Sequence, residues 1–210
     1  MESKIFYSLV LITLLSISFS ILVFADQIAI TENGKKVLLK DDGTWEFLKE
    51  EPKREELCDF RKTNWGMNKE QVKKTEKGKI VEEDENILTY QGNVAGLDCF
   101  VVYIFAEGKL VRAKYVFTET HSNKNDYILD YNKLKEILIK KYGKPIEDSQ
   151  LWRNDLYKDD YQNWGFAVSL GHLVYFALWE TPSTSIAMML DGENYEINLQ
   201  IEYLSKELKN

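Results

Sequence analysis

Four dipeptides that end in glycine constrain this chain more than any other feature. Each lies between two short runs in which apolar and polar residues alternate: Asn33-Gly34, Asp42-Gly43, Glu107-Gly108 and Asp191-Gly192. Tight two-residue turns need a positive φ at their central positions, and glycine adopts it without steric cost. Strands joined by such turns run antiparallel. The sequence therefore predicts antiparallel sheet both near its beginning and near its end.

The first two turns fall within residues 26–48, which we expect to form a small three-stranded β-meander. Apolar residues alternate around the turns and predict one apolar face: Ile28, Ile30, Val37, Leu39, Trp45 and Phe47. A sheet of this size is marginal alone, so we expect it to dock on the main domain, on another copy or on a partner. Residues 49–57 are charged, contain Pro52 and read as a linker.

Residues 58–210 are expected to form the main domain. Two helices are expected, over 68–77 and from the polar cluster 121–126 to Gly143, where two lysines, the glycine and Pro145 mark the end. A loop is expected to continue to about residue 163. The fold class is therefore α+β: an antiparallel sheet of about seven strands packed against two helices, preceded by the meander. The expected strands are 87–91, 97–106, 109–118, 164–170, 172–180, 184–190 and 194–204.

The tripeptide Asn-Trp-Gly occurs twice and raises the question of a repeated binding site. The first copy precedes Asn68, which can cap a helix while Gln71 reaches back to the cap. The second precedes Phe166, Val168 and Leu170, whose alternation predicts a strand. Because the two copies lead into different structures, we interpret them as two packing features, with a paired site as the alternative.

The first 25 residues read as a secretory signal. An uncharged apolar run follows Lys4, and Val23 and Ala25 form an ending typical of signal-peptidase cleavage. The alternative is an uncleaved anchor, because the run is as long as a membrane span needs. No cysteine lies near Ala25, which argues against a lipid anchor. We expect an exported protein, periplasmic or extracellular, with no membrane span after cleavage.

The charge and motifs of the chain exclude several function classes. A formal net charge of −7 with mixed signs argues against a nucleic-acid partner. Phosphate loops, dinucleotide fingerprints, zinc-binding helices and nucleophile elbows are missing from the sequence. We therefore expect no cofactor, no metal and no catalytic residues. His121, beside Glu119 and Ser122, is the weak candidate for hydrolase chemistry.

Acidic residues occur in two short groups that could attract a cation. Asp41 and Asp42 precede a glycine and favour a hairpin turn. Residues 82–86 lack the ligand spacing and the glycine of a calcium loop, so we favour a solvated loop. Neither group predicts a metal site.

Two cysteines, Cys58 and Cys99, leave two alternatives open. In an exported protein they can form a disulfide. They can equally remain two free thiols, because the sequence fixes neither geometry nor oxidation.

Aromatic residues are unusually frequent, with 5 Trp, 12 Tyr and 10 Phe. Many fall on expected strands, where they suit a pleated core face. The functional alternative is that one face stays open and binds a partner through tyrosine and tryptophan anchors. The candidate binding residues are Tyr103, Tyr115, Tyr175, Trp179 and Tyr203.

Several segments resemble uncharacterised bacterial exported proteins: WGMNKEQV (65–72), FAEGKLVRAKYVF (105–117), LKEILIKKYGKP (134–145) and IEYLSKEL (201–208). The first is also similar to the start of outer-membrane assembly lipoproteins of the BamE/SmpA type and of β-lactamase-inhibitor-like folds. KVLLKDDGTWEF (36–47) looks like a hairpin at the start of other exported proteins. The resemblance implies short helices on an antiparallel sheet and a role in protein binding, without catalytic residues.

These observations together predict an exported, non-enzymatic protein-binding or adaptor module of the cell envelope. Its partner would be an envelope protein bound at the aromatic sheet face or at the edge of the meander, because an exposed strand edge is a template for pairing. The alternative is a carrier that holds a small apolar ligand or lipid between the long helix and the sheet. A hydrolase that uses His121 is the third candidate.

Overall fold

A computed structural model describes residues 27–32, 36–40, 42–47 and 58–208 of the chain. The expected signal (1–25) and linker (49–57) lie outside the described residues. The chain divides into two compact units, residues 1–55 and 56–210, each described below by itself.

The first unit contains the expected three-stranded antiparallel meander of β1 (Gln27–Ile30), β2 (Lys36–Leu39) and β3 (Trp45–Phe47), in the order β1-β2-β3. The expectation of a single apolar face is wrong. Val37 pairs with Phe47 and Leu39 with Trp45, whereas Ile28 pairs with Leu38. Because directly paired residues share a face, the isoleucine lies opposite the aromatic rings. Both faces are therefore apolar.

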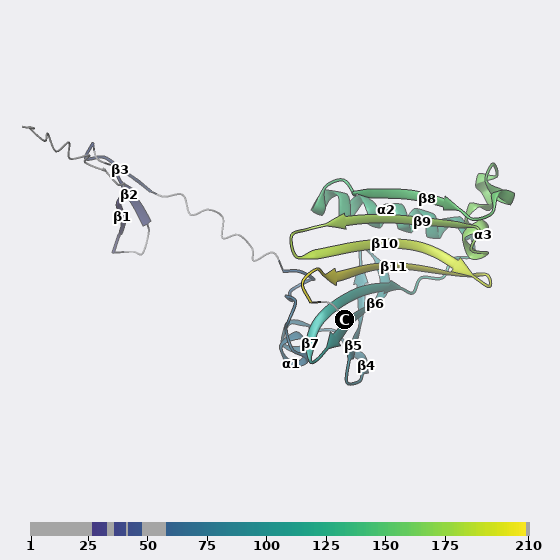
Figure 1. Cartoon of the computed structure of the whole chain (residues 1–210), viewed down its shortest axis with the longest axis horizontal. Coiled ribbons are helices and arrows are strands. Elements are labelled where there is room, and N and C mark those ends of the chain that lie inside the picture. Colours follow the sequence, from purple (N-terminus) through teal and green to yellow (C-terminus); the bar gives the residue numbers. More distant parts are fainter. Residues whose placement is uncertain (1–26, 33–35, 41, 48–57, 209–210) are drawn as a thin grey trace, which may run out of the picture. The chain divides into compact units, whose positions relative to one another are not determined.

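The second unit is built on one eight-stranded sheet in the order β4-β5-β6-β7-β11-β10-β9-β8, antiparallel throughout (Figure 1). The α+β class is confirmed, with eight strands where about seven were expected. The strands are β4 (Ile80–Glu83), β5 (Ile87–Val94), β6 (Leu97–Ala106), β7 (Lys109–Phe117), β8 (Glu147–Trp152), β9 (Leu173–Glu180), β10 (Thr184–Glu193) and β11 (Glu196–Ser205).

Both expected helices are present, as α1 (Lys69–Thr75) and α2 (Asn125–Tyr142). The Asn68 side chain accepts from the backbone N–H of Gln71, and the Gln71 side chain accepts from that of Asn68. This is the predicted capping box. At the end of α2, Gly143 has a φ of 83° and its N–H donates to the carbonyl of Ile139.

The segment after the second Asn-Trp-Gly is a helix, α3 (Trp164–Ser169), and the expected strand 164–170 is wrong. Phe166 and Leu170 recur at a spacing of four, which suits a helix as well as a strand. Ala167, Val168 and Ser169 are consecutive buried residues. A short helix buried on most sides carries no amphipathic signal, so local alternation was misleading here.

Three further features of this unit differ from expectation. Strand β4 was not expected, and it contains Glu82 and Glu83 of the acidic group 82–86 that was expected to be a loop. The expected loop 144–163 contains the edge strand β8 and two short 3-10 helices, η1 (Asp155–Tyr157) and η2 (Tyr161–Asn163). The final hairpin turns at Asn194 and Tyr195, both with positive φ, rather than at Asp191-Gly192, which lies inside β10. An edge strand faces solvent widely and needs no apolar alternation, which explains why β8 escaped prediction.

The core lies between the sheet and the helices, on one side of the sheet. Every second residue of the central strands is buried there, including Trp179 of β9, Met188 of β10 and Ile201 of β11. Leu134 and Leu138 of α2 pack into the same cluster. Figure 1 shows α2 running along one side of β8, β9 and β10, with α3 at one end. The predicted two-layer arrangement is therefore present.

Candidate functional site: the open sheet face and its terminal depression

Four of the five predicted binding residues belong to the core. Tyr103, Tyr175, Trp179 and Tyr203 are between 0% and 5% exposed, and Tyr115 is only partly exposed. Side chains this deeply buried cannot contact a partner without unfolding the domain. The structure therefore corrects the expectation that these residues form an open binding face.

The hydroxyl of Tyr103 belongs to a hydrogen-bond network inside the domain and does not reach the surface. Its hydroxyl donates to Glu76, whose carboxylate also accepts from Arg61 Nε at 2.7 Å and from Nη2 at 3.2 Å. The Glu76 side chain is only 7% exposed. A carboxylate this far from water needs a positively charged partner, and the Arg61 guanidinium is that partner. Burial and the bond to Glu76 raise the pKa of Tyr103 well above its usual range.

Arg61 itself has a φ of 51°, an uncommon conformation for a residue with a side chain. It lines an open depression of about 350 Å³ beside Lys62 and Lys77. Its guanidinium, however, is already paired with Glu76. The network therefore joins the start of the domain to the end of α1 and is not free to bind a ligand.

The side of the sheet opposite the core is open. The buried hydrophobic residues of α1, α2 and α3 all belong to the core cluster. Residues that alternate with core positions therefore point away from the helices. Among them, Phe100 pairs with Val116 across β6 and β7, and Phe176 pairs with Met189 across β9 and β10. Antiparallel sheets often carry polar residues on a face that is open to solvent. Apolar pairs on such a face therefore indicate a candidate binding surface.

Eight apolar residues of the open face form two patches. The β6–β7 patch comprises Phe100, Val102, Ile104 and Val116, and the β9–β10 patch comprises Phe176, Leu178, Ala187 and Met189. Phe100 is 39% exposed, and the other seven side chains are partly exposed.

A mostly polar stripe on β7 and β11, which also contains Leu204, separates the two patches. Arg112 Nε lies 3.5 Å from Glu202 Oε1, and Lys114 is the cross-strand neighbour of Glu202. The face therefore combines apolar area with charges of both signs, a composition common in non-obligate protein interfaces.

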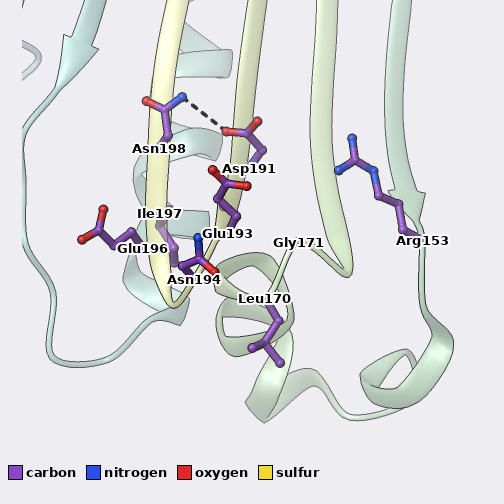
Figure 2. Close-up of a pocket in the computed structure, with 10 residues that line it drawn as sticks. Arg153, Leu170, Gly171, Asp191, Glu193, Asn194, Glu196, Ile197 and Asn198 are labelled. Carbon is purple, nitrogen blue, oxygen red and sulfur yellow. Dashed lines mark hydrogen bonds between the residues drawn. The ribbon is translucent and has the colours of Figure 1, made fainter.

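A depression of about 720 Å³ lies at one end of the open face. Figure 2 shows Asp191 and Asn198 side by side on β10 and β11, with Arg153 across the depression at the end of β8. Asn198 Nδ2 donates to Asp191 Oδ1 at 3.3 Å. Two further carboxylates, of Glu193 and Glu196, line it as well. The lining therefore offers both donors and acceptors, and three of its four charged side chains are acidic.

Close backbone packing shapes this depression. A Cβ on Gly192 would lie 2.4 Å from the carbonyl oxygen of Glu196 and 2.7 Å from that of Val168, so only glycine fits. A Cβ on Gly171, whose φ is 73°, would lie 2.9 Å from the Gly192 carbonyl oxygen. The β10–β11 hairpin and the turn after α3 therefore meet backbone to backbone.

A row of aromatic rings joins the turn of the β10–β11 hairpin to α3 and η1, and none of its residues lines the depression. It begins at Tyr195, in the turn of the hairpin, and continues through Phe166 and Tyr157 to His172, with centroid separations of 6.0, 5.6 and 6.1 Å. Tyr195 is 63% exposed. These residues were not predicted as candidates, because the alternation pattern singles out aromatic residues on strands and not those in turns and short helices.

His121 is paired with a carboxylate but not with a nucleophile. Its Nε2 lies 2.6 Å from Asp130 Oδ2, and its ring contacts Tyr127 edge to face. Within the described residues, no serine, threonine or cysteine side chain is hydrogen-bonded to the imidazole. A histidine–carboxylate pair alone does not make a hydrolytic triad.

The cysteines are separate thiols in this structure. Cys58 is partly exposed and Cys99 is buried, and both are free, so the disulfide alternative is not realised in it. Burial raises the pKa of Cys99 to about 11, which keeps that thiol protonated and unreactive near neutral pH.

Neither acidic group forms a metal site in the described parts of the chain. Asp42 Oδ1 accepts from the N–H and the hydroxyl of Thr44, as expected of a turn, and Asp41 lies outside the described residues. Asp84 Oδ1 accepts from the N–H groups of Asn86 and Ile87. Across the described residues, no three histidine, cysteine, aspartate or glutamate side chains gather closely enough to hold a metal ion.

The space between α2 and the sheet is filled by side chains. Tyr131 of α2 contacts the ring of Tyr175 with centroids 5.3 Å apart, and Leu134, Leu138 and Met188 complete the layer. Both depressions described above are lined by residues outside this layer. The arrangement gives the carrier hypothesis no support.

Within the described ranges, no helix is long and apolar enough to cross a membrane. Comparison of the chain with protein-family models, with curated proteins and with solved structures gives no match.

Proposed function

We propose that this chain is an exported, non-enzymatic module that binds another protein of the cell envelope through the open face of its sheet. The observation that carries the proposal is the pair of apolar patches on that face. Contiguous exposed apolar surface is uncommon on soluble proteins and marks interaction sites. The proposal keeps the predicted activity but moves it to the opposite side of the sheet.

The composition of the face favours a protein partner. Phe100 and Met189 belong to residue types enriched in interface cores. The charged stripe between the patches, with Arg112, Lys114 and Glu202, supplies orientation and specificity rather than affinity. An eight-stranded face spans roughly 35–40 Å across its strands at about 4.8 Å each. A face of this width has room for a standard interface, which buries about 800 Å² on each partner.

The export and non-enzymatic parts of the proposal rest on separate observations. Export rests on the apolar run after Lys4 and the ending at Ala25. Mass spectrometry of the mature protein, isolated from cells that make it naturally, tests this directly through the position of the first residue. The non-enzymatic part is supported by the His121–Asp130 pair, because no serine, threonine or cysteine side chain in the described part of the chain is hydrogen-bonded to the imidazole.

Site-specific photo-crosslinking tests the binding face. A photoreactive residue replaces Phe100 in one variant and Met189 in another, and the matched control replaces Leu129. Leu129 is 64% exposed on α2, on the helical side of the domain. We expect both face variants to capture the same envelope protein in intact cells, and the Leu129 variant not to capture it.

A second change makes the test specific. Val102→Glu, in the centre of the β6–β7 patch, should abolish capture at Met189 while the thermal unfolding temperature stays close to that of the unmodified protein. If capture from Leu129 equals that from the face, or if the Val102→Glu variant folds normally and retains capture, the binding face lies elsewhere.

A further inference from the structure

The large sheet of the second unit ends in two edge strands, and they differ in how well they are protected against further pairing. An edge strand presents backbone N–H and C=O groups that can pair with another strand, and bulges, charges and short length hinder this pairing. β4 has four residues, a shift of register between Ile80 and Glu82, and two carboxylates. β8 has six residues in unbroken register with β9 and contains neither proline nor lysine. β8 is therefore the less protected edge.

Alternate residues of β8 present their backbone groups away from β9. The N–H of Arg153 donates to the carbonyl of His172 at 2.7 Å, which continues the β8–β9 ladder one residue beyond Trp152. Hydrogen-bonded and non-bonded pairs alternate along an antiparallel ladder. The N–H and C=O groups of Asp148, Gln150 and Trp152 therefore point outward. In the described part of the chain, β8 is the last strand of the sheet and no strand pairs with this side of it.

Two opposite charges lie at the two ends of β8, on the same face of the sheet. Glu147 pairs with Leu178, so its side chain belongs to the open face. Arg153 lines the depression at the end of that face (Figure 2). Among the described residues, neither Glu147 nor Arg153 forms an ion pair, whereas Asp148 is neutralised by Lys135 Nζ at 3.0 Å. The edge therefore carries one unmatched negative and one unmatched positive charge.

Two copies of β8 complement each other in one antiparallel register. Residues with outward backbone groups must face each other for the hydrogen bonds to form. A two-fold axis at Gln150 meets this condition, because Asp148 of one copy then faces Trp152 of the other. The same axis places Glu147 of each copy beside Arg153 of the other. About six backbone hydrogen bonds and two ion pairs then join the copies.

Other features favour this register and this edge. An axis at Ser149 also aligns the outward groups, but it places Glu147 beside Leu151 and leaves both charges unmatched. Leu151 is 54% exposed, and Ile146, which directly precedes β8, is 65% exposed. Pairing of the edges removes part of this apolar surface from water. A self-complementary edge of this kind is what a two-fold symmetric interface requires.

We propose that two copies of this chain associate by antiparallel pairing of β8 with β8, with the two-fold axis at Gln150 and an ion pair between Glu147 and Arg153 at each end. The axis stands perpendicular to the sheet, so the open faces of both copies lie on the same side of one continuous sheet. The β9–β10 patches of the two copies are then neighbours across the two β8 strands. The proposal goes beyond protein binding at the open face and does not depend on it, because it rests on the edge of the sheet.

Sedimentation velocity of the purified protein over a range of concentrations tests the pairing. We expect a monomer–dimer equilibrium with a micromolar Kd, because one pair of strands buries less area than a standard interface. Glu147→Arg and Arg153→Glu each place like charges side by side and should raise the dimer Kd by about tenfold or more, one step of 1.4 kcal/mol. The double variant restores opposite charges at both ends. Its Kd should return to within about threefold of that of the unmodified protein, half of such a step.

Cysteine pairing tests the register. The proposed axis makes Ser149 of one copy face Leu151 of the other, with Cα atoms about 4.5 Å apart. Ser149→Cys mixed with tagged Leu151→Cys, both combined with Cys58→Ser, should therefore form a disulfide-linked heterodimer under mild oxidation. Neither variant should link to itself, because its own two Cα atoms would stand roughly 8 Å apart, beyond the reach of a disulfide.

Two further variants locate the contact between the copies. Gln150→Pro removes an outward N–H from the middle of the edge and should make the protein monomeric. Val102→Glu, on the β6–β7 patch, is the matched control and should leave the dimer Kd within about twofold, well under one 1.4 kcal/mol step. Thermal unfolding of each variant shows whether it is folded before its association is compared.

Three outcomes would overturn the proposal. The first is that the protein stays monomeric up to its solubility limit; capture of a different protein by a photoreactive residue at Gln150 would then assign the edge to that partner. The second is that folded Gln150→Pro remains dimeric, which places the contact between copies elsewhere. The third is that Ser149→Cys links to itself or that the charge exchange restores nothing, which excludes this register. None of these results alters the expected capture at Phe100 and Met189, so the two proposals fail separately.

Discussion

The indole Nε1 of Trp179 donates a hydrogen bond of 2.9 Å to the carbonyl oxygen of Gly143, the residue at which α2 ends. This contact joins β9 to the last turn of the long helix and satisfies one of the carbonyls that a helix end leaves without an intrahelical partner. A residue expected to anchor a partner thus fastens the helical layer to the sheet.

Replacing Trp179 should therefore reduce stability. Trp179→Ala removes a side chain that is 1% exposed and should lower the free energy of unfolding by about 3–5 kcal/mol. Trp179→Phe keeps most of the ring but loses the bond to Gly143, and should cost about 1–3 kcal/mol. Urea denaturation measures both losses of stability. Unfolding is followed by far-UV circular dichroism, because the substitutions themselves change the tryptophan fluorescence. A negligible loss for Trp179→Ala would mean that the indole is not in the core.

Gly165 should tolerate no side chain. A Cβ there would lie 2.2 Å from the carbonyl carbon of Lys124, and the Gly165 N–H donates to Asn125 Oδ1 at 2.6 Å. Gly165→Ala should separate α3 from the start of α2 and cost at least about 3 kcal/mol. Gly108→Ala is the control: it has a φ of 73° but no atom near the added Cβ, and should cost about 1–2 kcal/mol. Equal denaturation midpoints for the two variants would contradict this assignment.

The capping box should contribute measurably to stability, because α1 has only seven residues. Asn68→Ala removes the acceptor for the Gln71 N–H and should cost about 0.5–2 kcal/mol. Asn68→Asp keeps an acceptor and should cost much less. Equilibrium denaturation of the two variants checks the difference, and a loss of the same size in both would show that the side-chain cap is unimportant.

Two buried tyrosines should respond oppositely to loss of the hydroxyl. The hydroxyl of Tyr175 has no hydrogen-bond partner within the described residues, whereas that of Tyr103 donates to buried Glu76. Tyr175→Phe should be neutral or stabilising, because it removes a buried polar group. Tyr103→Phe should cost about 1.5–3 kcal/mol, the range for a bond to a charged group. Thermal unfolding of the pair provides the measurement, and the reverse order of stability would refute the assignment.

Stability should fall at alkaline pH. Burial raises the pKa of Tyr175 to about 12 and that of Cys99 to about 11, from ordinary values of 10.0 and 9.0. Below about pH 9 both groups stay protonated in the folded and unfolded chains, so their contribution to the free energy of unfolding is fully present. As the pH rises towards the folded values, the unfolded chain ionises first and releases protons. Each unit of difference between the folded and the unfolded pKa then lowers the free energy of unfolding by up to about 1.4 kcal/mol.

Urea denaturation at pH 8, 10 and 11 follows this loss. Tyr175→Phe should show a smaller decline than the unmodified protein, because one of the contributing groups is absent. An identical decline in the two proteins would show that the Tyr175 hydroxyl is not perturbed by folding.

Features that depend on neighbouring residues were predictable from sequence. The capping box at Asn68, the end of α2 at Gly143 and the hairpin of β6 and β7 all follow from backbone preferences within a few positions. The burial of Tyr103 and Trp179 was one of two alternatives for their strands. Alternation shows that a strand has two faces, but it cannot show which face a helix covers.

The sequence by itself determined the antiparallel class and the long helix, because turn chemistry and helical periodicity act over short distances. Only the tertiary structure decided that α3 is a helix, that β8 completes the sheet, that Ile28 and Trp45 lie on opposite faces and that Phe100 and Met189 are on the open side. Each of these depends on which distant segments pack together. Contacts between residues far apart in the chain set burial and register, and no local pattern records them.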